Sequence, residues 1–101
     1  MENDEFWSPY DEIFCRGDLT PAEKITLVNL VIERNKYLSD KKLSELTTFK
    51  LNYIRKILSS LRKKGFITSD YEEYEYENKR MIHFTDKTKE ILYYIDFSKG
   101  E

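Results

Sequence analysis

Hydrogen-bond donors and positive charges recur at helical spacing between residues 50 and 64. Lys50 lies where a helix would open, and one face of that helix carries the side chains of Asn52, Tyr53, Lys56, Ser59 and Lys63. Ammonium groups pair with phosphate oxygens, and an amide side chain both donates and accepts hydrogen bonds. The chemistry that this face could perform is the binding of an anionic, hydrogen-bonding partner.

The residue types that catalysis needs are scarce in this chain. His83 is the one histidine, and it lies between Ile82 and Phe84 in an expected strand, where a structural role is the simpler interpretation. Cys15 is the one cysteine, so it cannot form an internal disulfide. The acids show no metal-ligand spacing, and the three glycines are not spaced to cradle a phosphate. We therefore expect no enzymatic activity, no metal site and no cofactor.

Length and composition predict one globular domain. The chain has 101 residues, of which 40% are hydrophobic and 36% are charged, a balance that suits a folded protein with a modest core. It contains no apolar run near the length of a membrane span and no signal-peptide pattern. These features predict a cytoplasmic protein that does not associate with a membrane.

The charge is segregated along the chain, so the net charge of −2 is a poor guide to partners. Residues 1–23 hold seven acids and one base, residues 41–64 hold eight bases and one acid, and residues 70–77 hold five acids and no base. The field at a contact surface depends on the local charge. An acidic protein can therefore bind nucleic acid through one basic face.

The basic face needs a helix to hold it, and the apolar residues predict one from about residue 49 or 50 to residue 64. The apolar face of this helix consists of Leu51, Ile54, Ile57, Leu58 and Leu61. Basic residues fill its last turn, where they suit the helix dipole, and Gly65 follows as a residue that ends a helix at low cost.

Further elements are expected before this helix. Thr20 and Glu23 form a capping-box pattern around Pro21, which predicts a largely buried helix over residues 20–34. Residues 37–38 predict a short strand, and Ser39 or Asp40 is expected to cap a second helix over residues 41–46.

A β-hairpin is expected after Gly65, with strands at residues 66–68 and 80–84 and its turn at residues 77–79. The intervening segment, residues 70–77, is acidic and rich in tyrosine. Two interpretations stay open: a solvated strand whose tyrosines pack along one face, or a surface that contacts another protein or a second copy of the chain.

The two ends of the chain are aromatic. Residues 85–97 predict a last helix capped by Thr85 and apolar over a broad face, which would either pack on the N-terminal segment or mediate dimerisation. Residues 1–19 form an acidic arm with aromatic side chains, among them Phe6, Trp7 and Tyr10. The arm either covers the domain's own core or docks on a partner.

Residues 43–67 resemble the helix-turn-helix of winged-helix DNA-binding proteins. The resemblance rests on Leu43, Ser44, Glu45, Leu46, Thr47, Thr48 and Phe49 in the turn region, and on Ile54, Leu58, Leu61, Lys64, Gly65, Phe66 and Ile67 in the helix and wing entry. Thr48 stands where the family usually has glycine. The resemblance implies an α+β winged helix-turn-helix fold over residues 20–97, with a three-helix core, a β-hairpin wing and an additional C-terminal helix.

The resemblance also implies a site for double-stranded DNA. The helix over residues 49–64 would enter the major groove, with side chains from the preceding helix and the wing on the DNA backbone. The expected DNA-binding residues are Lys41, Lys42, Lys50, Asn52, Tyr53, Arg55, Lys56, Lys63, Lys79 and Arg80. A homodimer through the C-terminal helix and the N-terminal arm would present two such helices to successive half-sites.

Several functions are compatible with this fold. A small transcriptional regulator is the first. A replication-initiation accessory protein is another, because the segment from Leu19 to Lys24 resembles the opening of winged-helix domains in phage and plasmid replication initiators, including DnaD-type proteins. A protein-interaction module on a winged-helix fold is the third, because a fold does not dictate a function.

Overall fold

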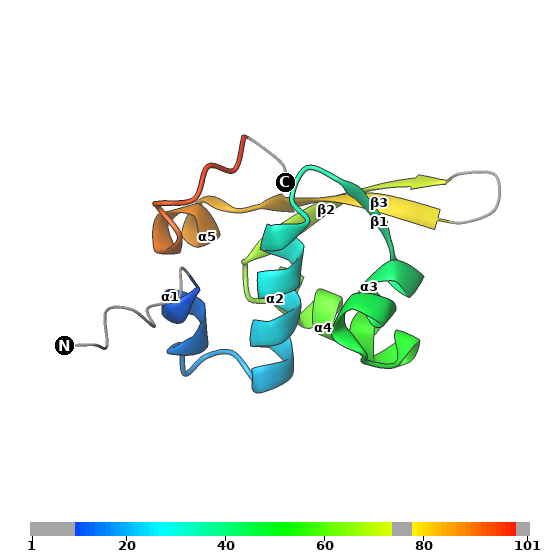
Figure 1. Ribbon diagram of the computed structural model, residues 1–101, viewed down its shortest axis with the longest axis horizontal. Coiled ribbons are helices and arrows are strands. Elements are labelled where there is room, and N and C mark those ends of the chain that lie inside the picture. Colours follow the sequence, from blue (N-terminus) through cyan, green and yellow to red (C-terminus); the bar gives the residue numbers. More distant parts are fainter. Residues whose placement is uncertain (1–9, 74–77, 99–101) are drawn as a thin grey trace.

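A capping box starts the central helix, α2 (Pro21–Ile32), as the sequence predicts. The Thr20 hydroxyl accepts a hydrogen bond from the Glu23 amide at 3.2 Å, and the Glu23 carboxylate accepts one from the Thr20 amide at 2.9 Å. The helix buries Leu27, Leu30 and Val31 among the other elements. The computed structural model, shown in Figure 1, describes residues 10–73 and 78–98. For residues 69–73 and 78–80 it describes the backbone and not the side chains.

Two further helices pack against α2 and complete a three-helix unit. Ser39 caps α3 (Asp40–Thr47) by accepting a hydrogen bond from the Lys42 amide at 3.0 Å. Helix α4 (Leu51–Lys63) buries Ile54, Ile57, Leu58 and Leu61. Leu51, which was expected on the same apolar face, is 36% exposed because it lies in the first turn, at the edge of that face. Gly65, with φ of 85°, ends the helical path in the left-handed region. The predictions for both helices are confirmed to within two residues at each end.

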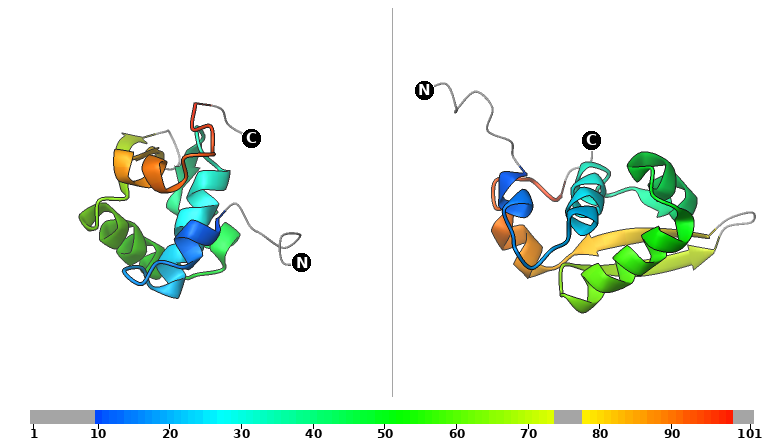
Figure 2. Two further views of the ribbon diagram at one scale, coloured as in Figure 1. Left: turned by 90° about the vertical axis from the view of Figure 1, so that its left-hand side faces the viewer. Right: turned by 90° about the horizontal axis from the view of Figure 1, so that it is seen from below.

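A three-stranded antiparallel sheet lies on one side of these helices (Figures 1 and 2). Its strands are β1 (Tyr37–Ser39), β2 (Ile67–Glu73) and β3 (Asn78–Phe84), in the order β1-β3-β2. Strand β1 pairs with β3 through Leu38 opposite Arg80. The short first strand and the hairpin are therefore both present, and the hairpin extends away from the helices.

The predicted bounds of the hairpin were wrong. Strand β2 continues to Glu73, which pairs with Asn78, and Glu72 pairs with Lys79. Asn78 and Lys79 therefore belong to β3 and do not form the turn; residue 77 lies outside the described residues. Backbone hydrogen bonds between the strands do not depend on an apolar pattern, so the ladder runs on into residues 70–73 of the acidic segment, which one of the two open interpretations took as a strand.

The predicted long C-terminal helix was also wrong. Helix α5 (Asp86–Ile91) is short, and the chain from Leu92 onward leaves the helical path. Two side chains at the end of α2 bind carbonyls of this segment: Arg34 Nε donates to Asp96 O, and Asn35 Nδ2 donates to Phe97 O, both at 3.0 Å. These bonds and the packing of the Phe97 ring on Phe84, 5.1 Å between centroids, favour an irregular path over a helix.

Thr85 precedes α5 but does not cap it with its side chain. Its hydroxyl instead donates to Gly65 O at 2.6 Å, and its amide donates to Phe66 O at 3.2 Å. These bonds join the start of α5 to the end of α4. The expectation of a Thr85 cap is corrected accordingly: the residue occupies the capping position and uses its hydroxyl elsewhere.

Part of the acidic arm belongs to the core. Helix α1 (Asp11–Phe14) packs on α2, and Ile13 and Leu19 are buried in the same cluster as the residues of α2 and α4. Tyr10 packs against that cluster, while Phe14 is 43% exposed. For these residues the arm covers the domain's own core; Phe6 and Trp7 lie outside the described residues.

The described residues thus form a small α+β domain with a winged-helix-like arrangement. Helices α2, α3 and α4 share one core with β1, Phe66, Ile82 and Leu92. Within residues 10–73 and 78–98, no helix is long and apolar enough to cross a membrane.

Candidate nucleic-acid interface

Three residues connect α3 to α4, and Thr48 makes the turn. Thr48 takes the left-handed conformation, with φ of 63° and ψ of 11°. The Thr47 hydroxyl donates to Leu43 O at 2.8 Å and accepts from the Phe49 amide at 3.3 Å, and the Ser44 hydroxyl donates to Phe49 O. Side-chain hydrogen bonds therefore support a turn that glycine would adopt without strain.

Replacing Thr48 by glycine is expected to stabilise the protein. A β-branched residue in the left-handed region costs about 1–2 kcal/mol, and glycine avoids most of this while adding entropy to the unfolded chain. The net gain should be up to about 1 kcal/mol in the free energy of unfolding, measured in urea. Thr48→Ala keeps the β-carbon and should gain much less; an equal gain in both variants would contradict the assignment of strain to φ.

Helix α4 turns a polar, basic face to solvent. Lys50 occupies its N-cap position, and the side chains of Asn52 and Lys56 are exposed. Tyr53 is 46% exposed, and its ring meets the partly buried Phe49 ring edge-on, 5.4 Å between centroids. Packing on Phe49 restricts the tyrosine while leaving one side of it open. The side chains that the sequence predicted to share this face do share it.

The remaining predicted residues lie on three elements. Lys41 and Lys42 are exposed in the first turn of α3, and Lys63 is exposed in the last turn of α4. Lys79 and Arg80 lie in β3, and their side chains are not among those described. Among the described residues, no ion pair neutralises Lys41, Lys42, Lys50, Lys56 or Lys63.

Arg55 differs from these lysines because it has an acidic partner. Its Nε donates to Asp40 Oδ2 at 3.2 Å, which links α4 to the first residue of α3. The Arg55 side chain is 57% exposed, whereas that of Asp40 is 15% exposed. The guanidinium is therefore held at one edge and open to solvent at the other.

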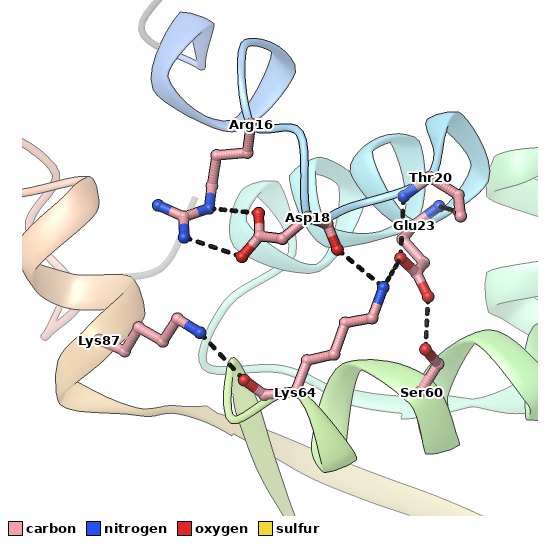
Figure 3. A network of polar contacts seen from close by, with 7 residues as sticks. All are labelled: Arg16, Asp18, Thr20, Glu23, Ser60, Lys64 and Lys87. Atoms are coloured by element: carbon pink, nitrogen blue, oxygen red, sulfur yellow. Dashed lines mark hydrogen bonds and ion pairs between the residues drawn. The ribbon is translucent and has the colours of Figure 1, made fainter.

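A buried carboxylate fixes the orientation of α4 (Figure 3). Glu23 of α2 is 5% exposed, and its Oε1 accepts a hydrogen bond from Lys64 Nζ at 2.7 Å. Its Oε2 accepts one from the Ser60 hydroxyl, and Lys64 Nζ also donates to Asp18 O at 2.8 Å. These contacts join the C-terminal end of α4 to the start of α2, so they determine which face of α4 is exposed.

The Glu23 carboxylate stays ionised in this network. Burial by itself would raise the pKa of Glu23, but the hydrogen bonds from Lys64, Ser60 and the Thr20 amide outweigh it and hold the pKa below its ordinary value. Lys64 is thus paired with Glu23, so its charge contributes less to the positive surface of α4 than the charges of the exposed lysines.

A groove of about 220 Å³ runs beside this network between α2 and α4. It is lined by Thr20, Glu23, Tyr53, Lys56, Ile57 and Ser60. Pockets that hold drug-sized ligands usually measure roughly 300–1,000 Å³, so the groove is small for a ligand of that kind. In the part of the chain that the structure describes, no group of His, Cys, Asp or Glu could hold a metal ion.

Sequence reasoning missed the acids that orient this face. It assigned Glu23 only to a capping box and Asp40 only to a helix cap. Their second partners lie 41 residues away in Lys64 and 15 residues away in Arg55. No local pattern marks pairs at such separations. The nearest signal was that Glu23 sits in the first turn of a helix expected to be largely buried.

Comparisons with known proteins support the fold. No protein-family model matches the sequence, and no curated protein is significantly similar to it. Among solved structures, the chain is similar to AbfR in its disulfide-formed state, with a TM-score of 0.61 and 14% identity over 87% of this chain. The match covers 62% of the AbfR chain. At this identity the likeness concerns the fold alone, and it supports a helix-turn-helix type of fold.

Proposed function

We propose that this protein is a sequence-specific DNA-binding protein, a small transcriptional regulator that inserts α4 into the major groove. One observation carries the proposal: α4 exposes Lys50, Asn52, Tyr53 and Lys56 on the face opposite its buried side, directly after a three-residue turn from α3. The major groove of B-DNA is wide enough to admit an α-helix. The likeness in fold to AbfR is compatible with this function.

The contacts follow from the chemistry of each side chain. Asn52 can pair with the N6 and N7 edge of adenine, and Tyr53 can donate to a phosphate or touch a thymine methyl group. The lysines at positions 41, 42, 50, 56 and 63 would meet phosphates, where Lys41 and Lys42 add to the positive end of α3. Phosphate contacts would fix the position of the protein, and the base contacts would select the sequence.

Alanine at positions 50, 52 and 56 is expected to weaken DNA binding without unfolding the protein, because all three side chains are exposed. Each lysine change should reduce the slope of log affinity against log salt by about 1, which fluorescence anisotropy measures with pooled random duplexes titrated with salt. Asn52→Ala should reduce the discrimination between bases at one position of the site by about 1–3 kcal/mol, which is measured with a selected duplex and its single-base variants.

Lys89→Ala is the matched control, since Lys89 is exposed on α5 and lies outside the predicted site. It should leave the salt slope close to that of the wild type. If wild-type protein fails to bind duplex DNA at low salt, the proposed function is wrong. If it binds but the three α4 variants bind equally well, DNA binding stands and the assignment to α4 falls.

A protein-interaction role is the second candidate, in line with the five acids of residues 70–77. Tyr93, which is 81% exposed, is a further apolar side chain available to a partner or to a second copy. Sedimentation of the same samples, with and without DNA, distinguishes the candidates: self-association without DNA binding favours the interaction role. A dimer that binds DNA would suit a regulator or a replication-initiation accessory protein.

A further inference from the structure

Asp40 has a local role as the acid in the first turn of α3, where a negative charge suits the helix dipole, but that role does not require a partner on α4. The partner is Arg55, whose side chain is 57% exposed, whereas that of Asp40 is 15% exposed. The pair also places an acid beside Lys41 and Lys42, where a negative charge opposes the binding of phosphate. A surface built only to attract phosphates would gain from the loss of Asp40.

The geometry of the pair gives it another use. Asp40 binds Arg55 through Nε alone, at 3.2 Å. The Arg16–Asp18 pair on the other side of the molecule shows the contrast, because there the carboxylate takes both Nε and Nη2, each at 2.9 Å. The described residues give Arg55 Nη1 and Nη2 no hydrogen-bond partner. The end of the guanidinium, with its parallel N–H groups, is thus left to a ligand.

Arg55 lies beside the residues of the proposed DNA face in the sequence of α4. Arg55 lies one turn after Asn52 and directly before Lys56, in the N-terminal half of α4 that would enter the groove. An arginine fork matches the O6 and N7 acceptors of guanine in the major groove, and this is the commonest base-specific contact. Holding Nε from behind reduces the rotamer freedom that such a contact must otherwise remove.

We propose that Asp40 is a positioning residue that orients Arg55 to bind guanine in the major groove. This rests on the proposed function, and it makes a guanine part of the preferred site. The sequence placed Arg55 among the expected DNA-binding residues, and this proposal assigns it a base contact. Asp40 acts on specificity, since its charge lowers affinity for DNA in general while its hydrogen bond favours one base.

The test uses a duplex selected by the full chain from a random pool. Replacing its guanines one at a time by 7-deazaguanine, which lacks the N7 acceptor, should identify a guanine whose change weakens wild-type binding by roughly fivefold or more. That sensitivity should vanish in Arg55→Ala, which removes every donor that could reach N7. In Asp40→Ala the sensitivity should fall toward that of Arg55→Ala, while binding to random duplexes becomes tighter.

Glu45→Ala is the matched control, because Glu45 is another exposed acid of α3 and no ion pair links it to Arg55. It should tighten binding to random duplexes in the same way and keep the full sensitivity to 7-deazaguanine. The sensitivity is a ratio of two affinities measured on one sample, so a partly unfolded variant does not change it.

Unchanged sensitivity in Asp40→Ala, or in Arg55→Ala at every guanine, overturns the proposal and leaves the proposed function intact. Weaker binding of Asp40→Ala to random and selected duplexes alike also overturns it, because that result indicates a purely structural role. Absence of wild-type DNA binding removes the proposed function and this inference with it.

Discussion

Phe66→Ala is expected to lower the free energy of unfolding by about 3–5 kcal/mol, the usual cost of truncating a fully buried aromatic side chain. Phe66 is completely buried in the core cluster. Domains of this size are stable by only about 5–15 kcal/mol, so the change should remove a large share of the total stability. Urea unfolding followed by circular dichroism measures the effect.

The position of Phe66 in the chain places the resulting cavity where three elements meet. Its amide donates to Leu61 O at 3.0 Å as the chain leaves α4, and its carbonyl accepts from the Thr88 hydroxyl at 2.7 Å. The Lys87 ammonium lies 4.3 Å from the centre of its ring. The residue therefore connects α4, β2 and α5, and a cavity here would loosen all three.

Two variants separate burial from aromatic character. Phe66→Leu refills most of the space and should cost clearly less than Phe66→Ala. Tyr93→Ala removes an aromatic side chain that is 81% exposed, and it should change stability by no more than about 0.5 kcal/mol. A Phe66→Ala protein as stable as the Tyr93→Ala protein would refute the position of Phe66 in the core.

Elements defined by neighbouring residues were predicted well from the sequence. The capping box of Thr20 and Glu23 and the apolar face of α4 involve residues within a few positions of each other, so the pattern in the chain contains the information. The exposure of Asn52, Tyr53 and Lys56 followed from the same helical period. The exposed face of α4 could thus largely be predicted from the sequence.

Elements defined by distant residues were not predictable in this way. Residues 92–97 have the apolar spacing of a helix, but hydrogen bonds from Arg34 and Asn35, up to 62 residues away, hold them in another path. At residues 92–97, therefore, tertiary contacts override local preference. Thr48 is a different case, because the left-handed turn there is supported by neighbouring residues: the Ser44 hydroxyl donates to Phe49 O, and the Thr47 hydroxyl accepts from the Phe49 amide.

The acids that orient α4 show the same division. Asp40 and Glu23 each have a local role at the start of a helix, which the sequence reveals, and a distant role on α4, which it does not. The basic residues could therefore be predicted as a set, but the structure was needed to show that Arg55 pairs with Asp40 and Lys64 with Glu23, while several lysines have no ion pair among the described residues.

Glu23→Gln is expected to cost about 1.5–3 kcal/mol at neutral pH, the range for hydrogen bonds to a charged group. The amide oxygen can still accept from the Thr20 amide, but the amide nitrogen that takes the place of Oε2 cannot accept from the Ser60 hydroxyl, and the side chain carries no charge to match Lys64. The loss should appear as weaker attachment of α4 to α2. Urea unfolding at pH 7 measures its size.

The same substitution should change how stability depends on pH. The pKa of Glu23 is lower in the folded protein than the ordinary glutamate value of 4.5, so its contribution is fully present above pH 4.5. As the pH falls below that value, the unfolded chain takes up the proton first, and the contribution is lost as the pH passes through the folded pKa. Glu23→Gln lacks this titration, so its stability should fall less steeply in acid than that of the wild type.

Lys64→Met tests which interaction holds the pKa down. Burial is the largest single influence on Glu23 and acts to raise its pKa, and the Lys64 ammonium is the strongest of the groups that oppose it. Without Lys64 the pKa should rise, so that less stability is lost in acid even though the carboxylate is retained. The carboxyl ¹³C chemical shift of Glu23, followed by NMR against pH, measures this directly. A pKa that does not move in Lys64→Met would show that Ser60 and the Thr20 amide alone keep the carboxylate ionised, and α4 would then be held by Ser60 and not by the ion pair.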